Sequence, residues 1–122
     1  MRAKDAVGEY GERLAVRHLV AEGFEVLACN WRCREGEIDV VGRDGAALVV
    51  VEVKTRRHED YGDPLEAITR RKLARLRGLA AAFARDLADR TGEHVPEVRI
   101  DAVGVLVPAR GPAVVHHVRG VG

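Results

Sequence analysis

Three features are scarce in this sequence of 122 residues: cysteine, long apolar runs and net charge. Cys29 and Cys33 are the only cysteines, and without a second pair we expect reduced thiols rather than a disulfide or half of a zinc site. No apolar run approaches membrane-spanning length and no signal-peptide pattern opens the chain, which predicts a cytoplasmic protein that does not contact a membrane. The formal net charge of +1 does not by itself indicate a nucleic-acid-binding protein.

Positive charge is nevertheless concentrated locally. The chain is long enough for one domain, expected over residues 1–122, with an ordinary content of 47% hydrophobic and 32% charged residues. Arg56 and Arg57 follow a charged strand, and one later helix carries Arg70, Arg71, Lys72, Arg75 and Arg77. Local positive potential beside acidic residues suits a polyanion, so we expect a nucleic acid, in particular DNA, as the partner.

A predicted buried strand at residues 48–54 carries two charged side chains. Its β-branched residues are typical of a strand, in which side chains alternate between two faces. Glu52 and Lys54 therefore point the same way, and burying them is unfavourable unless each finds a partner. A structural ion pair between them is one explanation, and a metal site is the other.

A hairpin is predicted to precede this strand, with Asp44–Gly45 as its two-residue turn. Arg43 then pairs with Ala46, and Asp39 lies opposite Val50. This register is an assumption, because a slip of one residue would exchange the two faces of the strand.

In this register one face of the hairpin gathers charged side chains and the other gathers apolar ones. The charged face holds Glu35, Glu37, Asp39, Glu52 and Lys54. The apolar face holds Ile38, Val40, Val49, Val51 and Val53. Asp39 lies diagonal to Glu52, about 7–8 Å away at the backbone, near enough for both carboxylates to hold one ion. Mg²⁺ or Mn²⁺ is the expected cofactor, because hard ions prefer carboxylate and carbonyl oxygens.

The periodicities predict the order α-β-β-β-α-β-β, a mixed α/β domain with a small sheet flanked by two helices. The helices are expected at residues 4–22 and 63–90, the second with Asp63 as N-cap and Pro64 as its first residue. The strands are expected at residues 24–30, 36–42, 46–55, 98–107 and 113–118. Gly78 is a weak point within the second helix.

Several motifs occur in an order that resembles the YraN-like family of uncharacterised bacterial proteins. They are Gly8–Glu12, Gly36–Asp39, Val51–Arg56, Leu65–Ile68 followed by Arg71–Lys72, and Arg99–Asp101. The resemblance covers roughly residues 8–103, with Ile100 in place of the usual aromatic residue. The last segment, Val114–Val118, matches only loosely, so no role is predicted for it.

The family resembles in turn the PD-(D/E)XK phosphodiesterase superfamily, which has the restriction endonuclease-like fold. Archaeal Holliday junction resolvases are similar in layout. By this resemblance Asp39 corresponds to the first acid, and Glu52 and Lys54 to the Glu-x-Lys motif. Glu12 corresponds to the glutamate of the first helix, whereas Ile38 replaces the proline that usually precedes the first acid.

The resemblance implies a nuclease that hydrolyses DNA phosphodiester bonds, on branched or recombination intermediates. Asp39, Glu52 and the carbonyl of Val53 would hold Mg²⁺ or Mn²⁺, which polarises the phosphoryl oxygen and lowers the pKa of a bound water. Lys54 would orient that water or stabilise charge on the phosphate, and Glu12 would complete the metal shell. The expected contacts to the nucleic-acid backbone are Arg56, Arg71, Lys72 and Arg75.

Other interpretations of the same residues stay open. Glu12 is alternatively a solvated helix residue or a partner of Arg13 or Arg17. The domain is alternatively a non-catalytic nucleic-acid-binding or adaptor module, or a purely structural partner in a DNA-processing complex. Under the nuclease hypothesis a homodimer is expected, because it would supply a second cutting site and more surface for the substrate.

The histidines suggest no function at this stage. His18 lies on the apolar side of the first helix and is expected to be a core histidine. His116 and His117 are neighbours on a strand and point to opposite faces, so they predict neither a metal pair nor a switch. Asp101 is expected to pair with Arg99 on the face that the two residues share.

Overall fold

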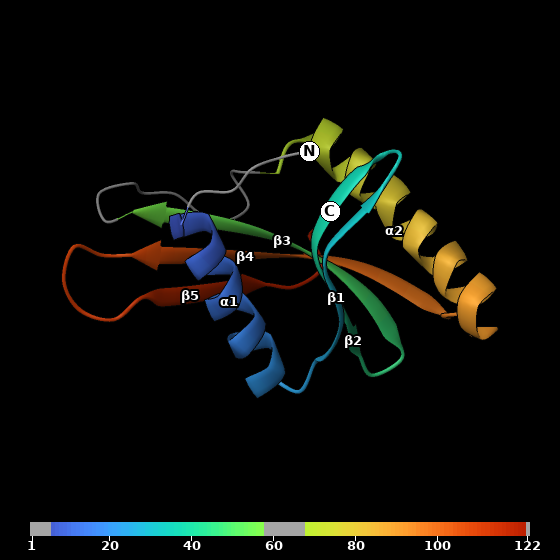
Figure 1. Cartoon of the computed structure of the whole chain (residues 1–122), viewed down its shortest axis with the longest axis horizontal. Coiled ribbons are helices and arrows are strands. Elements are labelled where there is room, and N and C mark those ends of the chain that lie inside the picture. Colours follow the sequence, from blue (N-terminus) through green and yellow to red (C-terminus); the bar gives the residue numbers. More distant parts are fainter. Residues whose placement is uncertain (1–5, 58–67, 122) are drawn as a thin grey trace.

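The computed structural model describes residues 6–57 and 68–121. Within these residues, two helices and five strands follow one another in the predicted order α-β-β-β-α-β-β (Figure 1). They are α1 (Ala6–Ala21), β1 (Glu25–Cys33), β2 (Gly36–Asp44), β3 (Ala47–Arg57), α2 (Arg70–Thr91), β4 (Glu97–Val107) and β5 (Val114–Val118). The predicted α/β architecture is confirmed, because every expected element is present at its place in the chain.

The strands form one mixed sheet in the order β1-β2-β3-β4-β5. β3 and β4 pair in parallel, and the other neighbours pair antiparallel. A parallel pair needs a crossover connection, and the chain provides it through α2. Figure 1 shows α1 and α2 on opposite faces of the sheet, so the central strand β3 is covered on both faces.

Each face of the sheet has its own hydrophobic core. The α2-face core includes Leu48, Val50, Leu76, Leu79 and Phe83. The α1-face core includes Ala15, Leu19, Val40, Val49 and Val51. All of these side chains are at most 2% exposed, and burying a Val, Leu or Phe to this extent stabilises the fold by about 1.5–3 kcal/mol. The alternation predicted for residues 48–51 is therefore confirmed.

The predicted hairpin register is wrong by two residues. Arg43 pairs with Leu48 and not with Ala46, because the turn is formed by residues 45–46 and not by residues 44–45. A shift of two residues keeps every side chain on its face, so the error does not move the charged side chains of β3 to the other face.

The position of the turn has two local causes. Asp44 remains in β2, where its carboxylate accepts a hydrogen bond of 2.9 Å from Arg99 Nη2. Gly45 opens the turn with a φ of 59°, a left-handed conformation that glycine adopts without a steric cost. The Asp-Gly signal was therefore correct, but its aspartate belongs to the strand.

Ile38 lies on the face opposite to the predicted one. It packs in the α2-face core, whereas Val40 packs in the α1-face core with Val49 and Val51. The ladder between β2 and β3 ends at Val40, and residues 36–38 pair with β1. Figure 1 shows this end of the β1–β2 hairpin, coloured cyan, bending towards α2. The bend of β2 explains why strict alternation fails at Ile38.

The second helix begins later than predicted. Thr69 is its N-cap, and the Thr69 hydroxyl accepts a hydrogen bond of 3.1 Å from the Lys72 N–H. The predicted start at residues 63–64 lies outside the described residues. The helix runs without interruption through Gly78, and Gly92 ends it with a φ of 78°.

The scarce features of the sequence can also be located in the structure. Cys29 and Cys33 are not joined in a disulfide, and Cys33 Sγ lies 3.2 Å from a carboxylate oxygen of Glu35. In the described part of the chain, no helix combines the length and the apolar character that crossing a membrane requires.

Candidate functional site

The candidate site lies where β2 and β3 separate. The ladder between the two strands stops at the point where Asp39 and Glu52 would form the next pair. The two residues are therefore neighbours across the strands, and the prediction that Asp39 lies opposite Val50 is wrong. Oδ2 of Asp39 accepts a hydrogen bond of 2.9 Å from the N–H of Val53, so the side chain of Asp39 bridges the two strands.

Both carboxylates are withdrawn from water, since Asp39 is 3% exposed and Glu52 is 9% exposed. A buried carboxylate is unfavourable unless hydrogen bonds or positive charge compensate it. The Val53 N–H provides a hydrogen bond to Asp39, and the ammonium group of Lys72 forms an ion pair with Oε2 of Glu52. Lys72, predicted to contact a nucleic-acid backbone, is thus directed at the carboxylate in this structure.

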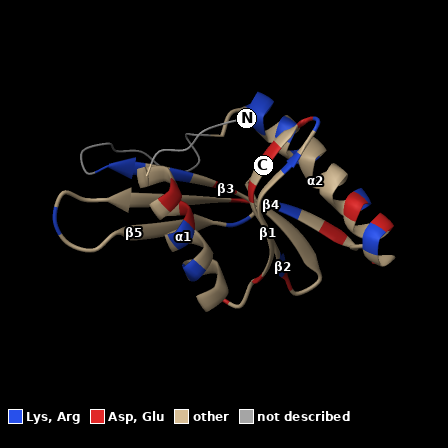
Figure 2. Cartoon of the chain, in the orientation of Figure 1, with Lys and Arg blue, Asp and Glu red and all other residues tan. Residues whose placement is uncertain are grey.

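The first turn of α2 is basic and lies next to these carboxylates. Arg70, Arg71 and Lys72 occupy the turn, and it contains no acidic residue. Positive charge at a helix N-terminus opposes the helix dipole by about 0.3–1 kcal/mol for each residue, so helix stability does not explain the placement. Figure 2 shows Lys and Arg at this end of α2 and at the end of β3, which includes Arg56.

The remaining predicted side chains lie nearer the solvent. Lys54 is exposed and follows Glu52 by two residues, which places both on the same face of β3. Arg71 and Arg75 are exposed on α2, and Arg56 is half-buried on β3. These basic residues are therefore accessible to a large anionic ligand.

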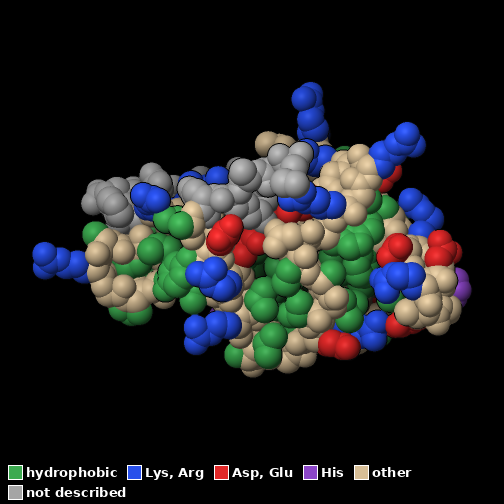
Figure 3. All heavy atoms as spheres, in the orientation of Figure 1, with side chains coloured by type: hydrophobic (Ala, Val, Ile, Leu, Met, Phe, Trp, Pro, Cys, Tyr) green, Lys and Arg blue, Asp and Glu red, His purple; other side chains and the backbone are tan. Residues whose placement is uncertain are grey.

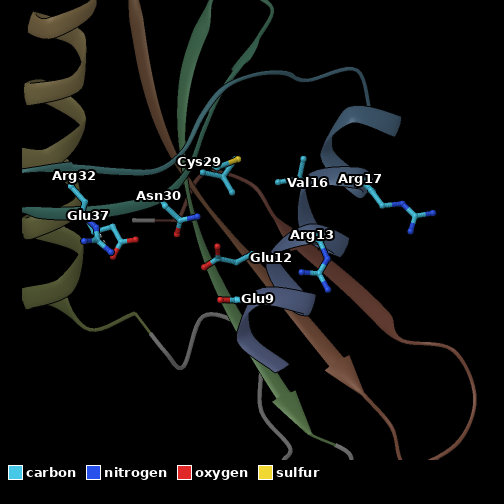
Figure 4. A pocket seen from close by; sticks show the side chains of 10 residues that line it. Glu9, Glu12, Arg13, Val16, Arg17, Cys29, Asn30, Arg32 and Glu37 are labelled. Carbon is cyan, nitrogen blue, oxygen red and sulfur yellow. Dashed lines mark ion pairs between the residues drawn. The ribbon is translucent and has the colours of Figure 1, made fainter. Parts of the chain in front are cut away.

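Glu12 lies on α1, where it lines an open pocket with a volume of about 790 Å³. The lining includes Glu9, Glu12, Asn30, Glu37 and Val40. Figure 4 shows the Glu12 carboxylate directed into the pocket towards Asn30, whereas Arg13 and Arg17 extend from the other side of the helix. Figure 3 shows acidic side chains beside Lys and Arg side chains over this helix. In Figure 4 the Glu12 carboxylate points away from both arginines, although Arg13 and Arg17 line the same pocket.

A close approach of α1 to β3 fixes the position of Glu12. A Cβ atom at the preceding residue, Gly11, would lie 1.9 Å from Oγ1 of Thr55, so only glycine permits this contact. Thr55 lies between Lys54 and Arg56 in the sequence. The structure thus pairs Glu52 with Lys72 of α2 and holds Asp39 against Val53 across the separation of the strands, while Glu12 lies on α1, which approaches β3 at Thr55.

The donor set at the separation of β2 and β3 fits a hard divalent cation. Asp39 and Glu52 supply carboxylate oxygens, and Val53 lies against Asp39 and contributes a backbone carbonyl to the same segment. These are the ligand types that Mg²⁺ and Mn²⁺ prefer. Glu52 already has a cationic partner in the Lys72 ammonium group, so an ion bound here would compete with Lys72 for the same carboxylate.

A second charged cluster, of which the sequence predicted only the Arg99–Asp101 pair, links the end of α1 to β4 and β5. Asp101 is fully buried and accepts hydrogen bonds of 2.8 and 3.0 Å from Arg99, which confirms the predicted pairing. Nε2 of His117 lies 2.8 Å from Asp101 Oδ2, and Nδ1 of His117 lies 2.7 Å from Glu22 Oε1. Nε2 of His18 lies 3.4 Å from the same Glu22 oxygen. The prediction that His18 is a core histidine is wrong, because its side chain is 34% exposed.

The contacts in this cluster lower the pKa values of its two carboxyl groups, Glu22 and Asp101. Hydrogen bonding to His117 lowers the pKa of Glu22 below its ordinary value. Burial raises the pKa of Asp101, but hydrogen bonds from Arg99, the Gly120 N–H and His117 outweigh burial and lower that pKa overall. The hydrogen bond to Asp101 in turn raises the pKa of Arg99.

Besides the Arg99–Asp101 pair, one further signal of this cluster was available in the sequence. His18 and Glu22 are four residues apart and therefore share one face of a helix. Their partner, His117, is 95 residues beyond Glu22, so no local pattern could have joined the three side chains.

Comparison with known proteins identifies close relatives over the whole chain. The model of the Uncharacterised protein family UPF0102 matches residues 11–105. A UPF0102 protein of Kineococcus radiotolerans is 60% identical over 121 residues, which cover 99% of this chain and 97% of the relative. A UPF0102 protein of Beutenbergia cavernae is 60% identical over 122 residues and is covered completely, as is this chain.

Two solved structures are more distantly similar. A repair endonuclease from Pyrococcus abyssi has a TM-score of 0.37 and 21% identity, covering 88% of this chain and 39% of that chain. The structure of an EndoMS-dsDNA2 complex has a TM-score of 0.39 and 22% identity, covering 91% of this chain and 43% of that chain. This chain therefore spans about two-fifths of the length of these solved chains.

Proposed function

The chain belongs to the UPF0102 family, and from the paired carboxylates between β2 and β3 we propose that it is a metal-dependent nuclease that hydrolyses DNA phosphodiester bonds. The observation that carries the proposal is the burial of Asp39 and Glu52 at adjacent positions of two separating strands. Carboxylates in such a position repel each other, and a divalent cation between them converts the repulsion into binding.

Asp39, Glu52 and the carbonyl of Val53 would hold Mg²⁺ or Mn²⁺. When bound, the ion supplies Lewis acidity towards a phosphoryl oxygen and towards a water. Asp39 is held in place by the Val53 N–H, so its orientation is set before any ligand arrives. Lys54 extends from the same face of β3 and stabilises negative charge that develops on the phosphate. Glu12 would act from α1, where its carboxylate points into the pocket and could accept a hydrogen bond from a water.

The basic first turn of α2 supplies the contact to the nucleic acid. Arg71 is exposed in this turn, Arg75 is exposed in the next turn of α2, and Arg56 lies on β3 two residues beyond Lys54. Their contacts to phosphate would give affinity without base specificity. Branched or recombining DNA is the proposed substrate class, and a homodimer would extend the small binding surface of a 122-residue chain.

One observation favours a second candidate function, a non-catalytic nucleic-acid-binding or adaptor module. The Lys72 ammonium group already neutralises Glu52, so this carboxylate is compensated without a metal ion. In such a module the basic residues would still bind DNA, and Asp39 would serve only to join β2 to β3 through the Val53 N–H.

Calorimetric titration of Mg²⁺ and Mn²⁺ separates the two functions. We expect binding to the wild type and binding at least about tenfold weaker in Asp39→Asn, which keeps the size of the side chain. Asp89→Asn, on the exposed surface of α2, is the matched control and should bind like the wild type. Absence of metal binding in the wild type, or equal binding in Asp39→Asn, would overturn the nuclease proposal.

The same proteins are then incubated with branched, single-stranded and duplex DNA. Cleavage by the wild type should depend on the metal and fall about 10²-fold or more in Lys54→Ala, because that residue acts on the charged phosphate. Lys54→Ala should retain metal binding, since the residue is exposed and is not a proposed ligand. DNA binding without cleavage of any of the three substrates would favour the adaptor module.

A further inference from the structure

A group of three potential metal ligands lies on the α1 face of the sheet, away from the carboxylates described above. His18 comes from the last turn of α1, Glu22 from the turn directly after that helix, and His117 from β5. One ligand atom from each residue lies within 4.8 Å of the others. His117 is paired in register with Val103, which packs in the α1-face core.

One separation between the ligand atoms matches a tetrahedral zinc centre, and another is a hydrogen-bond distance that would have to widen. Zinc bonds of about 2.0–2.1 Å to nitrogen or oxygen place neighbouring ligand atoms about 3.4 Å apart. Nε2 of His18 is 3.4 Å from Glu22 Oε1, and Nδ1 of His117 is 2.7 Å from the same oxygen. The shorter separation has room to widen, because the Glu22 side chain is 32% exposed.

We propose that His18, Glu22 and His117 form a zinc site that clamps the C-terminal end of α1 to β5. Two imidazole nitrogens and one carboxylate oxygen are a donor set that suits Zn²⁺ better than Mg²⁺. The ion would take the place of the proton that Nδ1 of His117 shares with Glu22. A water from the solvent-exposed side would complete the coordination.

Asp101 supports this assignment because it binds the ring nitrogen of His117 that faces away from Glu22. Histidines that bind a metal through one nitrogen commonly donate the other N–H to a carboxylate, which fixes the orientation of the ring. Nε2 of His117 lies 2.8 Å from Oδ2 of Asp101, which is fully buried and is itself held by Arg99. This arrangement directs Nδ1 of His117 towards Glu22 and His18.

The surrounding charges are mixed but permit a cation. Arg119 lies 3.7 Å from Oε2 of Glu22, so one cationic side chain approaches the site. The same arginine also pairs with Asp44, and this second carboxylate partly neutralises the positive charge near Glu22. The side chain of His18 is 34% exposed, which gives an ion a route from the solvent.

The test is a Zn²⁺ titration by calorimetry on protein in which Cys29 and Cys33 are replaced by serine, so that thiols do not compete for the metal. We expect one equivalent of Zn²⁺ to bind, and binding to weaken at least about tenfold in His18→Gln and in His117→Gln. His116→Gln is the matched control, because His116 is the exposed neighbour of His117 on β5. This control should bind like its parent.

Thermal denaturation provides a second readout. Zn²⁺ should raise the midpoint of the parent and of His116→Gln, and leave that of His18→Gln unchanged, because only an ion that binds the folded state stabilises it. His18 is partly exposed, so its variant should fold even where His117→Gln does not. Asp39→Asn should retain zinc binding, which separates this site from the proposed nuclease centre. Absence of Zn²⁺ binding, or equal binding in His18→Gln, would overturn the proposal.

Discussion

A single residue decides how closely α1 approaches the sheet. Gly11 is the point of contact between α1 and β3, and a methyl group there would meet Oγ1 of Thr55 at 1.9 Å and its Cγ2 at 2.7 Å. Gly78 is also within a helix, yet nothing lies within 4 Å of a Cβ at that position. Packing against Thr55 therefore requires glycine at position 11, whereas no packing contact requires it at position 78.

Alanine at these two positions should shift stability in opposite directions. Gly11→Ala should lower the free energy of unfolding by about 1–3 kcal/mol, because α1 must move away from β3. Gly78→Ala should raise it by about 0.5–1 kcal/mol, because alanine favours the helix and meets no neighbour. Urea denaturation measures both values, and stabilisation by Gly11→Ala would contradict the tight contact. Replacing Thr55 by glycine should restore part of the loss in Gly11→Ala.

At the scale of elements, the first turn of α2 both begins the helix and carries Lys72, a residue of the candidate site. Thr69 caps the helix by accepting the Lys72 N–H, and the side chain of Lys72 reaches Glu52. The helix therefore positions the cation that neutralises the buried carboxylate. The basic residues of this turn act against the helix dipole, which makes the cap more important to the first turn.

Removal of the cap should loosen this turn. Thr69→Ala should lower the free energy of unfolding by about 0.5–2 kcal/mol, whereas Thr69→Ser should stay close to the wild type because serine is also a good N-cap. Chemical denaturation followed by circular dichroism compares the two variants. Equal stability of the alanine and serine variants would show that the hydrogen bond to Lys72 does not stabilise the helix.

At the scale of the whole molecule, charge is nearly balanced but unevenly distributed. The net charge is +1, yet the start of α2 and the end of β3 are basic, and the acidic residues of the candidate site lie beside them. Under the proposed function a long polyanion would therefore be attracted to this end of the molecule, by local potential and not by total charge.

The salt dependence of DNA binding tests this orientation. We expect the double variant Arg71→Gln/Arg75→Gln to bind DNA with a weaker salt dependence. The slope of log affinity against log salt concentration should become less steep by about 1 for each lost phosphate contact. Arg85→Gln is the control, because residue 85 is exposed on the same helix, about 21 Å from residue 71 along its axis. An equal effect of Arg85→Gln would show that binding does not depend on this end of α2.

Much of the fold and part of the candidate site were predictable from the sequence. Alternation and turn residues predicted each strand, and the motif at Asp39, Glu52 and Lys54 identified the segments that meet at the candidate site. The hairpin register was wrong by two residues, because the carboxylate of Asp44 pairs with Arg99 from a strand more than fifty residues away. Ile38 was placed on the wrong face, because the bend of β2 is a property of the sheet and not of the local pattern.

The sequence by itself determined the elements and which side chains they carry, since helix and strand preferences act between residues close along the chain. Only the tertiary structure decided which distant side chains meet. Lys72 reaches Glu52 because α2 packs on one face of the sheet. His117 meets Glu22 because α1 packs on the other. Such meetings depend on helix packing and sheet twist, which no local pattern encodes.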